Sequence, residues 1–392
     1  MKILSHATYI GTSGYNSHCQ NFFKSLNKTN EVKIRNFSIS KNWKGLQSTD
    51  PHGGDADELD RDLIVQQSVW WKDREYNILK DFDIYAGLKD YTPDVNIVLA
   101  EVNHQYFFHN YSGPKIAYTV WESTIYPELF FNKLKEYDQV WVPSKWQAEI
   151  TDKQGIESNK IKIIPEGVNT SLFYPEDLKY EDDKFRFLIF GRWDDRKSIR
   201  ELIEAFKNVF GESEKVELVI SADNPQSVDG MKSTEERLKF YNINSNNIKI
   251  LHFPNKEDYA KYLKRGHVFL SCARSEGWNL PLIEAMACGI PSLYSNCSGQ
   301  LEFAQGKGIP VDVKGTATSL YVNCYSKNQL PGNWYDPDFK DLESKILEVY
   351  NNYNFYKDAA LKDSVLIRNE FTWDNAAKKA DQAIKELFKN RL

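Results

Sequence analysis

The sequence predicts an α/β protein made of two doubly wound, Rossmann-like domains with parallel sheets. Along almost all of its 392 residues, short apolar strand patterns alternate with amphipathic helix patterns. Such alternation is typical of parallel sheets with helices on both faces. The alternation forms two series, and the polar stretch YPEDLKYEDDK between them (174–184) has the charge and the proline of a linker. We therefore expect domains over 1–173 and 185–372, with ligands bound at the carboxyl ends of the strands in an inter-domain cleft.

Eleven apolar segments are the expected strands. They are KILSHATYI, VKIRNFSI, VNIVLAEV, KIAYTVWE, DQVWVPS and KIKIIPEGV in the first series, and FRFLIFG, VELVISA, IKILHF, HVFLSCA and PSLYS in the second.

Helices are predicted where apolar residues recur with helical spacing. Ser198–Phe210 is followed by Gly211, and Lys256–Arg265 by Gly266, and a glycine at that position commonly ends a helix. The last pattern, Trp373–Phe388, is long enough for residues 373–392 to pack back on the first domain. Two stretches fit poorly: Gly45–Asp60 resembles a surface excursion, and Val313–Asp338 is expected to be irregular.

The composition excludes several classes of protein. The net charge is -5 and no basic block stands out, which argues against a nucleic-acid partner. No apolar run approaches the roughly 20 residues of a transmembrane span, which leaves peripheral membrane contact open. The N-terminus is too short and polar for a signal peptide. The five cysteines lack paired spacing, so we expect a cytoplasmic protein without a disulfide framework or zinc site.

Two glutamates lie at the start of a predicted helix in EGWNLPLIEAMACGIP (276–291). Pro281 suits the first turn and Gly289 the end of a helix running from about Leu280 to Cys288. The N–H groups at such a helix start favour an anion, which carboxylates would repel. Glu276 and Glu284 therefore fit a ligand with hydroxyl groups on either side of a phosphate, as in a nucleotide sugar. The alternative is that one glutamate caps the helix while the other faces solvent or complements the helix dipole.

A second candidate element is the stretch FLIFGRWDDRKSIRELIEAF (187–206), a strand, a glycine turn, two cations and a helix. Lys197 at the helix start opposes the helix dipole unless an anion binds there. Together with Arg192 beside Gly191, it could clamp a diphosphate. The alternative is salt bridging of these cations with Asp194 or Asp195. A weaker signal is GTSGYNSH after the first strand, in which Gly11 and Gly14 flank a tight turn. It lacks the third glycine of the dinucleotide pattern, which disfavours a Rossmann oxidoreductase.

Together these elements resemble glycosyltransferase family 4, retaining enzymes of the GT-B fold. The resemblance rests on Glu276 and Glu284 within EG-x-x-LP-x-x-EAMA-x-G-x-P and on Gly191, Arg192 and Lys197. It also includes VPSKWQAEITDKQGI…KIIPEGVNTSLFYPE and GNWYDPDFKDLESKI.

The resemblance implies roles for individual residues. Arg192 and Lys197 would stabilise the leaving diphosphate, while Glu276 would hold the donor sugar and Glu284 the ribose. Backbone donors would come from Gly277, Trp278, Asn279 and Leu280, and Gly14 would shape the first-domain side of the site.

The sequence departs from the family pattern in two places. A family histidine in the first domain is replaced by Trp121-Glu122, so its role passes to Glu122, His104 or His109. Trp278 and Asn279 replace the common Phe and Gly, which would change the sugar that fits.

The predicted activity is retaining transfer of a sugar from a UDP- or GDP-linked donor to a hydroxyl of a glycan or other acceptor. The resemblance implies no metal or other cofactor, and Asp55-Ala-Asp57 matches the D-x-D of a different transferase fold by chance. Three alternatives are a sugar phosphorylase, a nucleotide-sugar epimerase and a non-catalytic sugar-binding relative.

Overall fold

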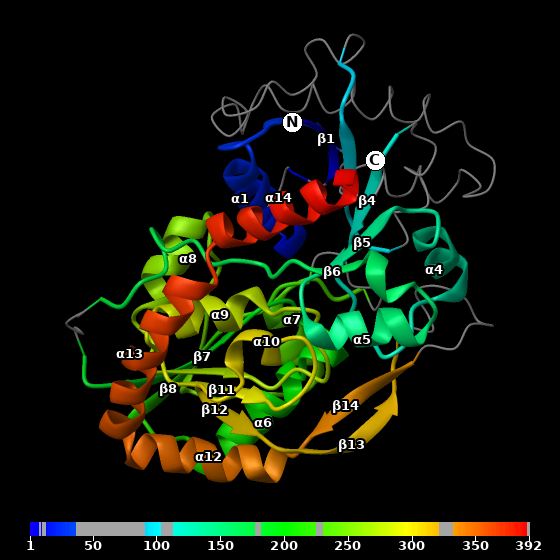
Figure 1. Cartoon of the computed structure of the whole chain (residues 1–392). Coiled ribbons are helices and arrows are strands. Elements are labelled where there is room, and N and C mark those ends of the chain that lie inside the picture. Colours follow the sequence, from blue (N-terminus) through cyan, green and yellow to red (C-terminus); the bar gives the residue numbers. More distant parts are fainter. Residues whose placement is uncertain are drawn as a thin grey trace. The chain divides into compact units, whose positions relative to one another are not determined.

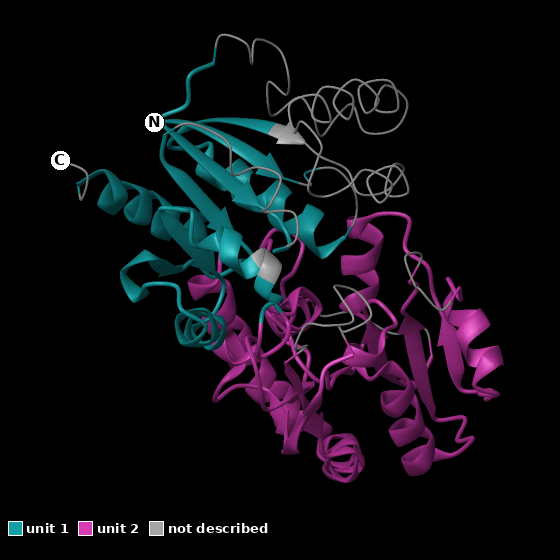
Figure 2. Cartoon of the chain, turned by 90° about the vertical axis from the view of Figure 1, so that its right-hand side faces the viewer, with its two compact units in different colours: residues 1–121, 126–167, 373–392 teal, residues 122–125, 168–372 magenta. Residues whose placement is uncertain are grey.

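The structure, a computed structural model, describes residues 1–7, 9, 13–36, 91–102, 113–176, 182–224, 230–320 and 332–389. These residues form two compact units (Figure 2). Unit 1 comprises 1–121, 126–167 and 373–392, and unit 2 comprises 122–125 and 168–372. The short segment Glu122–Ile125 therefore belongs to unit 2, although the chain on both sides of it belongs to unit 1.

Unit 1 is an α/β unit with one parallel sheet in the described part of the chain (Figure 1). Its strand order is β2-β1-β3-β4-β5-β6. Its elements are β1 (Lys2–Ala7), α1 (Gly14–Leu26), β2 (Glu31–Asn36), β3 (Val95–Leu99), β4 (Lys115–Tyr118), α4 (Glu128–Leu134), β5 (Gln139–Val142), α5 (Lys145–Lys153), β6 (Ile161–Ile163) and α14 (Trp373–Lys389).

The C-terminal helix α14 packs on α1 within this unit (Figure 1). Its inward face is made of small and apolar side chains, among them Ala380, Ala383 and Ile384, which are buried. The Nε2 of Gln139 on β5 donates to the Ala383 carbonyl at 2.9 Å, which ties the helix to the sheet. Residues more than 200 positions apart in the chain thus share one core.

Unit 2 contains a second parallel sheet with the order β12-β11-β10-β7-β8-β9. Its elements are β7 (Phe185–Phe190), the 3₁₀ turn η5 (Asp195–Lys197), α6 (Ile199–Phe210), β8 (Val216–Ser221), α7 (Thr234–Phe240), β9 (Ile248–Ile250), α8 (Lys256–Leu263), β10 (Val268–Ser271), α9 (Leu280–Ala287), β11 (Ser292–Ser295), α10 (Leu301–Ala304), β12 (Ile309–Val311), β13 (Val313–Thr318), β14 (Asn333–Pro337), α12 (Phe339–Asn351) and α13 (Tyr353–Glu370).

The sheet of unit 2 is buried on both faces, because side chains of β7 alternate between two cores. Phe187 and Ile189 belong to the core that α6 and α12 cover. Leu188 and Phe190 belong to the core on the other side, under α8 and α9. Helix α6 buries apolar residues at helical spacing, and Gly211 ends it with a positive φ of 55°.

The predicted fold class and all eleven predicted strands are confirmed, as β1 to β11. The prediction of irregular structure for Val313–Asp338 was wrong at both ends. β13 and β14 pair there as an antiparallel ribbon, with a register irregularity between Val313 and Gly315. Gly, Asn and Pro hide this ribbon in the sequence, and β13 is largely exposed, so it lacks an apolar pattern. Gly45–Asp60 lies outside the described residues.

No helix in the described ranges is long and apolar enough to cross a membrane.

The packing of α14 leads to a stability prediction. Ile384→Ala should lower the free energy of unfolding by about 2–5 kcal/mol, because it removes a buried side chain from the core of unit 1. Urea denaturation followed by circular dichroism measures this. Lys385→Ala, at the neighbouring exposed position, is the control and should stay within about 0.5 kcal/mol of the wild type. Equal stability of the two variants would contradict the packing of α14.

Candidate active site

The site in unit 2 begins where β7 ends. Gly191 has a φ of 152°, which favours glycine, and its N–H donates to the Ser221 carbonyl at 3.0 Å. Asp194 caps the following turn η5 by accepting a hydrogen bond from the Lys197 N–H at 2.9 Å. Helix α6 begins at Ile199, after Ser198 in the left-handed conformation, so Lys197 lies in the preceding turn rather than in the helix.

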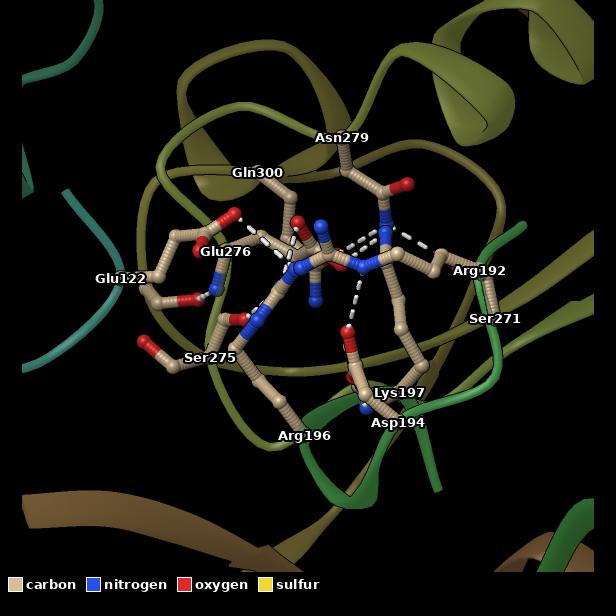
Figure 3. Close-up of polar contacts among 12 residues, drawn as sticks. Glu122, Arg192, Asp194, Arg196, Lys197, Ser271, Ser275, Glu276, Asn279 and Gln300 are labelled. Atoms are coloured by element: carbon tan, nitrogen blue, oxygen red, sulfur yellow. Dashed lines mark hydrogen bonds and ion pairs between the residues drawn. The ribbon is translucent and has the colours of Figure 1, made fainter. Parts of the chain in front are cut away.

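The second part of the site is the loop between β10 and α9. Asn279 precedes α9 with a φ of 90°, and its side chain does not cap the helix. Instead its Nδ2 donates to Ser271 Oγ at 3.0 Å and to Gln300 Oε1 at 2.8 Å (Figure 3). These bonds hold the loop against β10 and the start of α10.

Glu276 is buried in this loop, with 3% of the residue exposed. Two consecutive cations pair with its two oxygens: Arg196 Nη1 lies 2.9 Å from Oε2, and Lys197 Nζ lies 2.5 Å from Oε1 (Figure 3). Its backbone N–H donates to Ser298 Oγ at 3.0 Å. Since α9 starts four residues later, Glu276 does not cap that helix, and the capping alternative is wrong for it.

Arg196 is the site residue that sequence reasoning missed. It is 4% exposed, its Nη1 donates to the Ser275 carbonyl at 2.7 Å, and its Nη2 lies 3.0 Å from Glu122 Oε1. In the sequence it stands within DDRKS, a charged turn that looks solvent-exposed. No sequence pattern in this turn indicates that Arg196 is buried, because the other residues of DDRKS are all polar.

Glu122 joins this cluster because its segment is held within unit 2. Asn333 of β14 donates its N–H to Thr124 Oγ1 at 2.7 Å and accepts the Thr124 N–H at 3.3 Å. Trp334 Nε1 donates to the Glu122 carbonyl at 2.9 Å. The ribbon that the sequence analysis overlooked thus supports the segment that carries Glu122.

Arg192 points a different way from Lys197. Its Nε donates to Asp194 Oδ2 at 3.1 Å, and its side chain is 48% exposed, so the salt-bridge alternative describes Arg192 in this structure. Lys197 pairs with Glu276 instead. Burial alone would raise the pKa of Asp194, but the charges of Arg196, Arg192 and Lys197 hold that pKa below its ordinary value. Three cations therefore surround the carboxylate of Asp194.

Glu284 lies in the second turn of α9 and is 3% exposed, so the prediction that it faces solvent is wrong. Lys256 Nζ is 2.7 Å from Oε1, and the same ammonium lies 4.4 Å from the ring centroid of Tyr259. Burial and the charge of Glu284 raise the pKa of Tyr259 well above its ordinary value. Oε2 of Glu284 is buried and has no partner among the described residues. That oxygen can accept a hydrogen bond from a ligand.

The loop between Glu276 and α9 offers backbone donors. The N–H groups of Gly277, Trp278 and Asn279 donate to no atom in the described part of the chain. The ring of Trp278, however, packs in the core, 5.0 Å from Phe303 between centroids. The Trp278 ring is therefore part of this core, and Leu280 packs against the same core as the first residue of α9.

Of the remaining predicted residues, Gly14 begins α1 in unit 1. A Cβ built there meets nothing within 4 Å, so packing does not require a glycine at this position. Gly11, Asp55, Asp57, His104 and His109 lie outside the described residues.

Residues 172–316, which include both parts of this site, match the family model described as "Glycosyl transferases group 1". The match lies within unit 2.

One relative is the "Probable sucrose-phosphate synthase" of Thermosipho melanesiensis, 25% identical over 225 residues, or 56% of this chain and 46% of the relative. The chain spans about half the length of the curated relatives it matches.

Two solved structures resemble this chain over nearly its whole length. The sucrose-phosphate synthase of Thermosynechococcus elongatus superposes with a TM-score of 0.69 at 16% identity, covering 99% of both chains. Anabaena Alr3699/HepE in complex with UDP and glucose superposes with a TM-score of 0.68 at 13% identity, covering 98% of this chain and 100% of that one. At this identity the likeness supports the GT-B fold.

The close packing of the site loop in this group 1 segment gives a prediction. A Cβ on Gly299 would lie 2.0 Å from the Gly277 carbonyl oxygen and 2.7 Å from that of Glu276. Because both are backbone atoms, Gly299→Ala should displace the loop and lower the free energy of unfolding by about 1–3 kcal/mol or more. Thermal melting measures it. Gly315→Ala, where a Cβ meets nothing within 4 Å, is the control. A melting temperature unchanged in both variants would contradict the close approach.

Proposed function

We propose that this chain is a retaining glycosyltransferase that moves a sugar from a nucleoside diphosphate sugar to a hydroxyl group of a glycan or similar acceptor. The observation that carries the proposal is the convergence, in unit 2, of buried glutamates with backbone N–H groups that have no acceptor among the described residues. Lys197 and Arg196 reach Glu276 on one side of Gly277–Asn279, and Glu284 lies one turn into α9 on the other. The group 1 family match supports the same conclusion.

The arrangement separates anion-binding from hydroxyl-binding groups. The N–H groups of Gly277 to Asn279 and the Lys197 ammonium suit a diphosphate, since helix starts and cations bind anions. Buried carboxylates suit neutral hydroxyl groups, because an anion next to them would be repelled. In this proposal Glu276 binds the donor sugar and Glu284 the ribose, with support from Glu284 Oε2, which has no hydrogen-bond partner among the described residues.

Bond cleavage between the anomeric carbon and the diphosphate builds negative charge on the leaving oxygen. The loop fixes the N–H groups of Gly277 to Asn279 before the reaction, so they stabilise that charge without reorganisation, and Lys197 adds a positive charge once it turns from Glu276 to the diphosphate. In a retaining reaction, the acceptor hydroxyl attacks on the face that the diphosphate leaves, and the departing phosphate takes its proton. No dedicated protein base is then required.

The donor is proposed to be UDP- or GDP-linked, and the bound UDP and glucose of Anabaena Alr3699/HepE make UDP-glucose the first donor to test. Thermal-shift measurements with UDP, GDP, ADP and their sugars identify the nucleotide. Incubation of donor alone, donor with inorganic phosphate and donor with acceptor glycans then separates the candidate reactions. Acceptor-dependent release of nucleoside diphosphate supports transfer. Phosphate-dependent formation of a sugar phosphate would instead indicate a sugar phosphorylase, and epimerisation of the donor alone would indicate a nucleotide-sugar epimerase.

The clamp residues should act on the transition state. Lys197→Ala and Arg192→Ala should each lower kcat by about 10²-fold or more, since both cations would stabilise charge that grows as the diphosphate leaves. In this structure Arg192 pairs with Asp194, so its variant also tests whether it turns to the ligand. Steady-state kinetics with the full donor measures the effect.

Arg200→Ala is the matched control for Arg192. Its side chain is 46% exposed, close to the 48% of Arg192, and it pairs with acidic neighbours on α6. It should keep normal turnover. Near-normal kcat in Arg192→Ala would remove Arg192 from the clamp and leave it as the partner of Asp194.

Glu276→Gln and Glu284→Gln should differ in kind. Glu276→Gln should bind free nucleoside diphosphate normally and lose turnover with the full donor, because it would position the anomeric carbon. Glu284→Gln should weaken binding of both ligands by about 1–3 kcal/mol, because a buried hydrogen bond to the ribose is lost. Calorimetry and kinetics on both variants test this division. Equal weakening of free nucleotide binding by the two variants would refute it.

A further inference from the structure

Arg196 is a buried cation with three acceptors around it. Its Nη1 contacts both Glu276 Oε2 and the Ser275 carbonyl, and its Nη2 contacts Glu122 Oε1, all within 2.7–3.0 Å. Its own carbonyl accepts the Arg274 N–H at 2.7 Å, which fixes the backbone of the turn. A guanidinium presents several donors in a rigid plane, so one side chain can hold three acceptors in a set geometry.

The charges of the cluster explain why two cations are needed. Glu276 is buried and would be costly to leave without a partner. In this structure it pairs with both Arg196 and Lys197, one for each oxygen. If Lys197 turned to a diphosphate, Oε1 would lose its cation while Oε2 kept Arg196. The carboxylate would then stay compensated and in place.

Arg196 itself is poorly placed to follow the ligand. It is bonded to the loop through Ser275 and to the segment 122–125 through Glu122, which Trp334 in turn anchors. Lys197 has a side chain exposure of 13%, against 5% for Arg196, and its Nζ has one ion-pair partner in the described residues. Arg196 is therefore held in place by several partners, whereas Lys197 can exchange its partner Glu276 for a ligand.

We propose that Arg196 is a positioning residue that keeps Glu276 and Glu122 in place and thereby releases Lys197 to bind the donor diphosphate. The inference rests on the proposed function, because it assigns the diphosphate to Lys197. Without Arg196, Glu276 would hold Lys197 as its remaining cation and compete with the diphosphate for it.

The test is a double-mutant cycle that compares the Kd for UDP, or for GDP if the chain binds that nucleotide instead. We call it the binding cycle. Arg196→Met should weaken the Kd for the free nucleotide by about tenfold, since loss of one partner of a buried ion pair leaves Glu276 dependent on Lys197. In the Glu276→Gln background the same substitution should change the Kd by less than about threefold, because the competing charge is gone. A merely structural role would weaken binding equally in both backgrounds, and that result would overturn the inference.

Arg196→Lys is the conservative variant. It keeps one positive charge but cannot hold three acceptors, so it should restore most of the Kd while kcat with the full donor stays reduced. Recovery of both parameters would show that charge alone suffices and would overturn the positioning role. Melting curves show whether Arg196→Met folds. If it does not, the Arg196→Lys variant alone decides, by whether its Kd recovers while its kcat stays reduced.

Arg186→Met controls for the removal of a partly buried, ion-paired arginine. Arg186 lies on β7, at the end opposite to Gly191, and pairs with Asp182 and Glu217. It should lower stability without changing the Kd.

The two proposals can fail separately. If the wild-type chain binds nucleotide but transfers no sugar, the proposed function is overturned, while the binding cycle still decides the role of Arg196. Absence of nucleoside diphosphate binding would overturn both.

Discussion

The compensation of one buried carboxylate, Glu276, organises the site. A charge so deeply buried persists only with opposite charges beside it, and Arg196 and Lys197 supply them from the turn after β7. These two ion pairs also hold the loop after β10 against the turn after β7, and so link the ends of two neighbouring strands. Asp194 caps the turn, and Asn279 with Gln300 fixes the loop. Each part of the candidate site is therefore held by a neighbour and not by its own local propensity.

The doubly wound sheet explains why these residues meet. Parallel strands place their carboxyl ends at one edge, and β7 and β10 are neighbours in the sheet of unit 2. Arg192, Arg196 and Lys197 follow β7, while Glu276 and the free N–H groups follow β10. This adjacency and the start of α9 bring together the cations after β7, Glu276 and the backbone N–H groups of the loop before α9.

The β13–β14 ribbon adds a feature that the sheet alone would not provide. By binding Thr124 and the Glu122 carbonyl, it gives unit 2 a short segment whose neighbours in the chain belong to unit 1. The carboxylate of Glu122 then reaches Arg196 at 3.0 Å. Glu122, which stands where the sequence analysis expects a histidine by resemblance, is thus paired with a cation of the turn after β7.

The sequence by itself determined the two series of strands and helices, since period-two and period-3.6 apolar patterns follow from local backbone geometry. It also determined the candidates Gly191, Lys197, Glu276 and Glu284, because their spacing places them at the ends of strands and the start of a helix. Only the tertiary structure decided which cation meets which carboxylate. Burial of Arg196, the pairing of Glu284 with Lys256 and the core position of the Trp278 ring depend on residues 25 to 80 positions away in the chain. Charge pairing depends on distance in space, and a one-dimensional pattern of charged residues does not specify it.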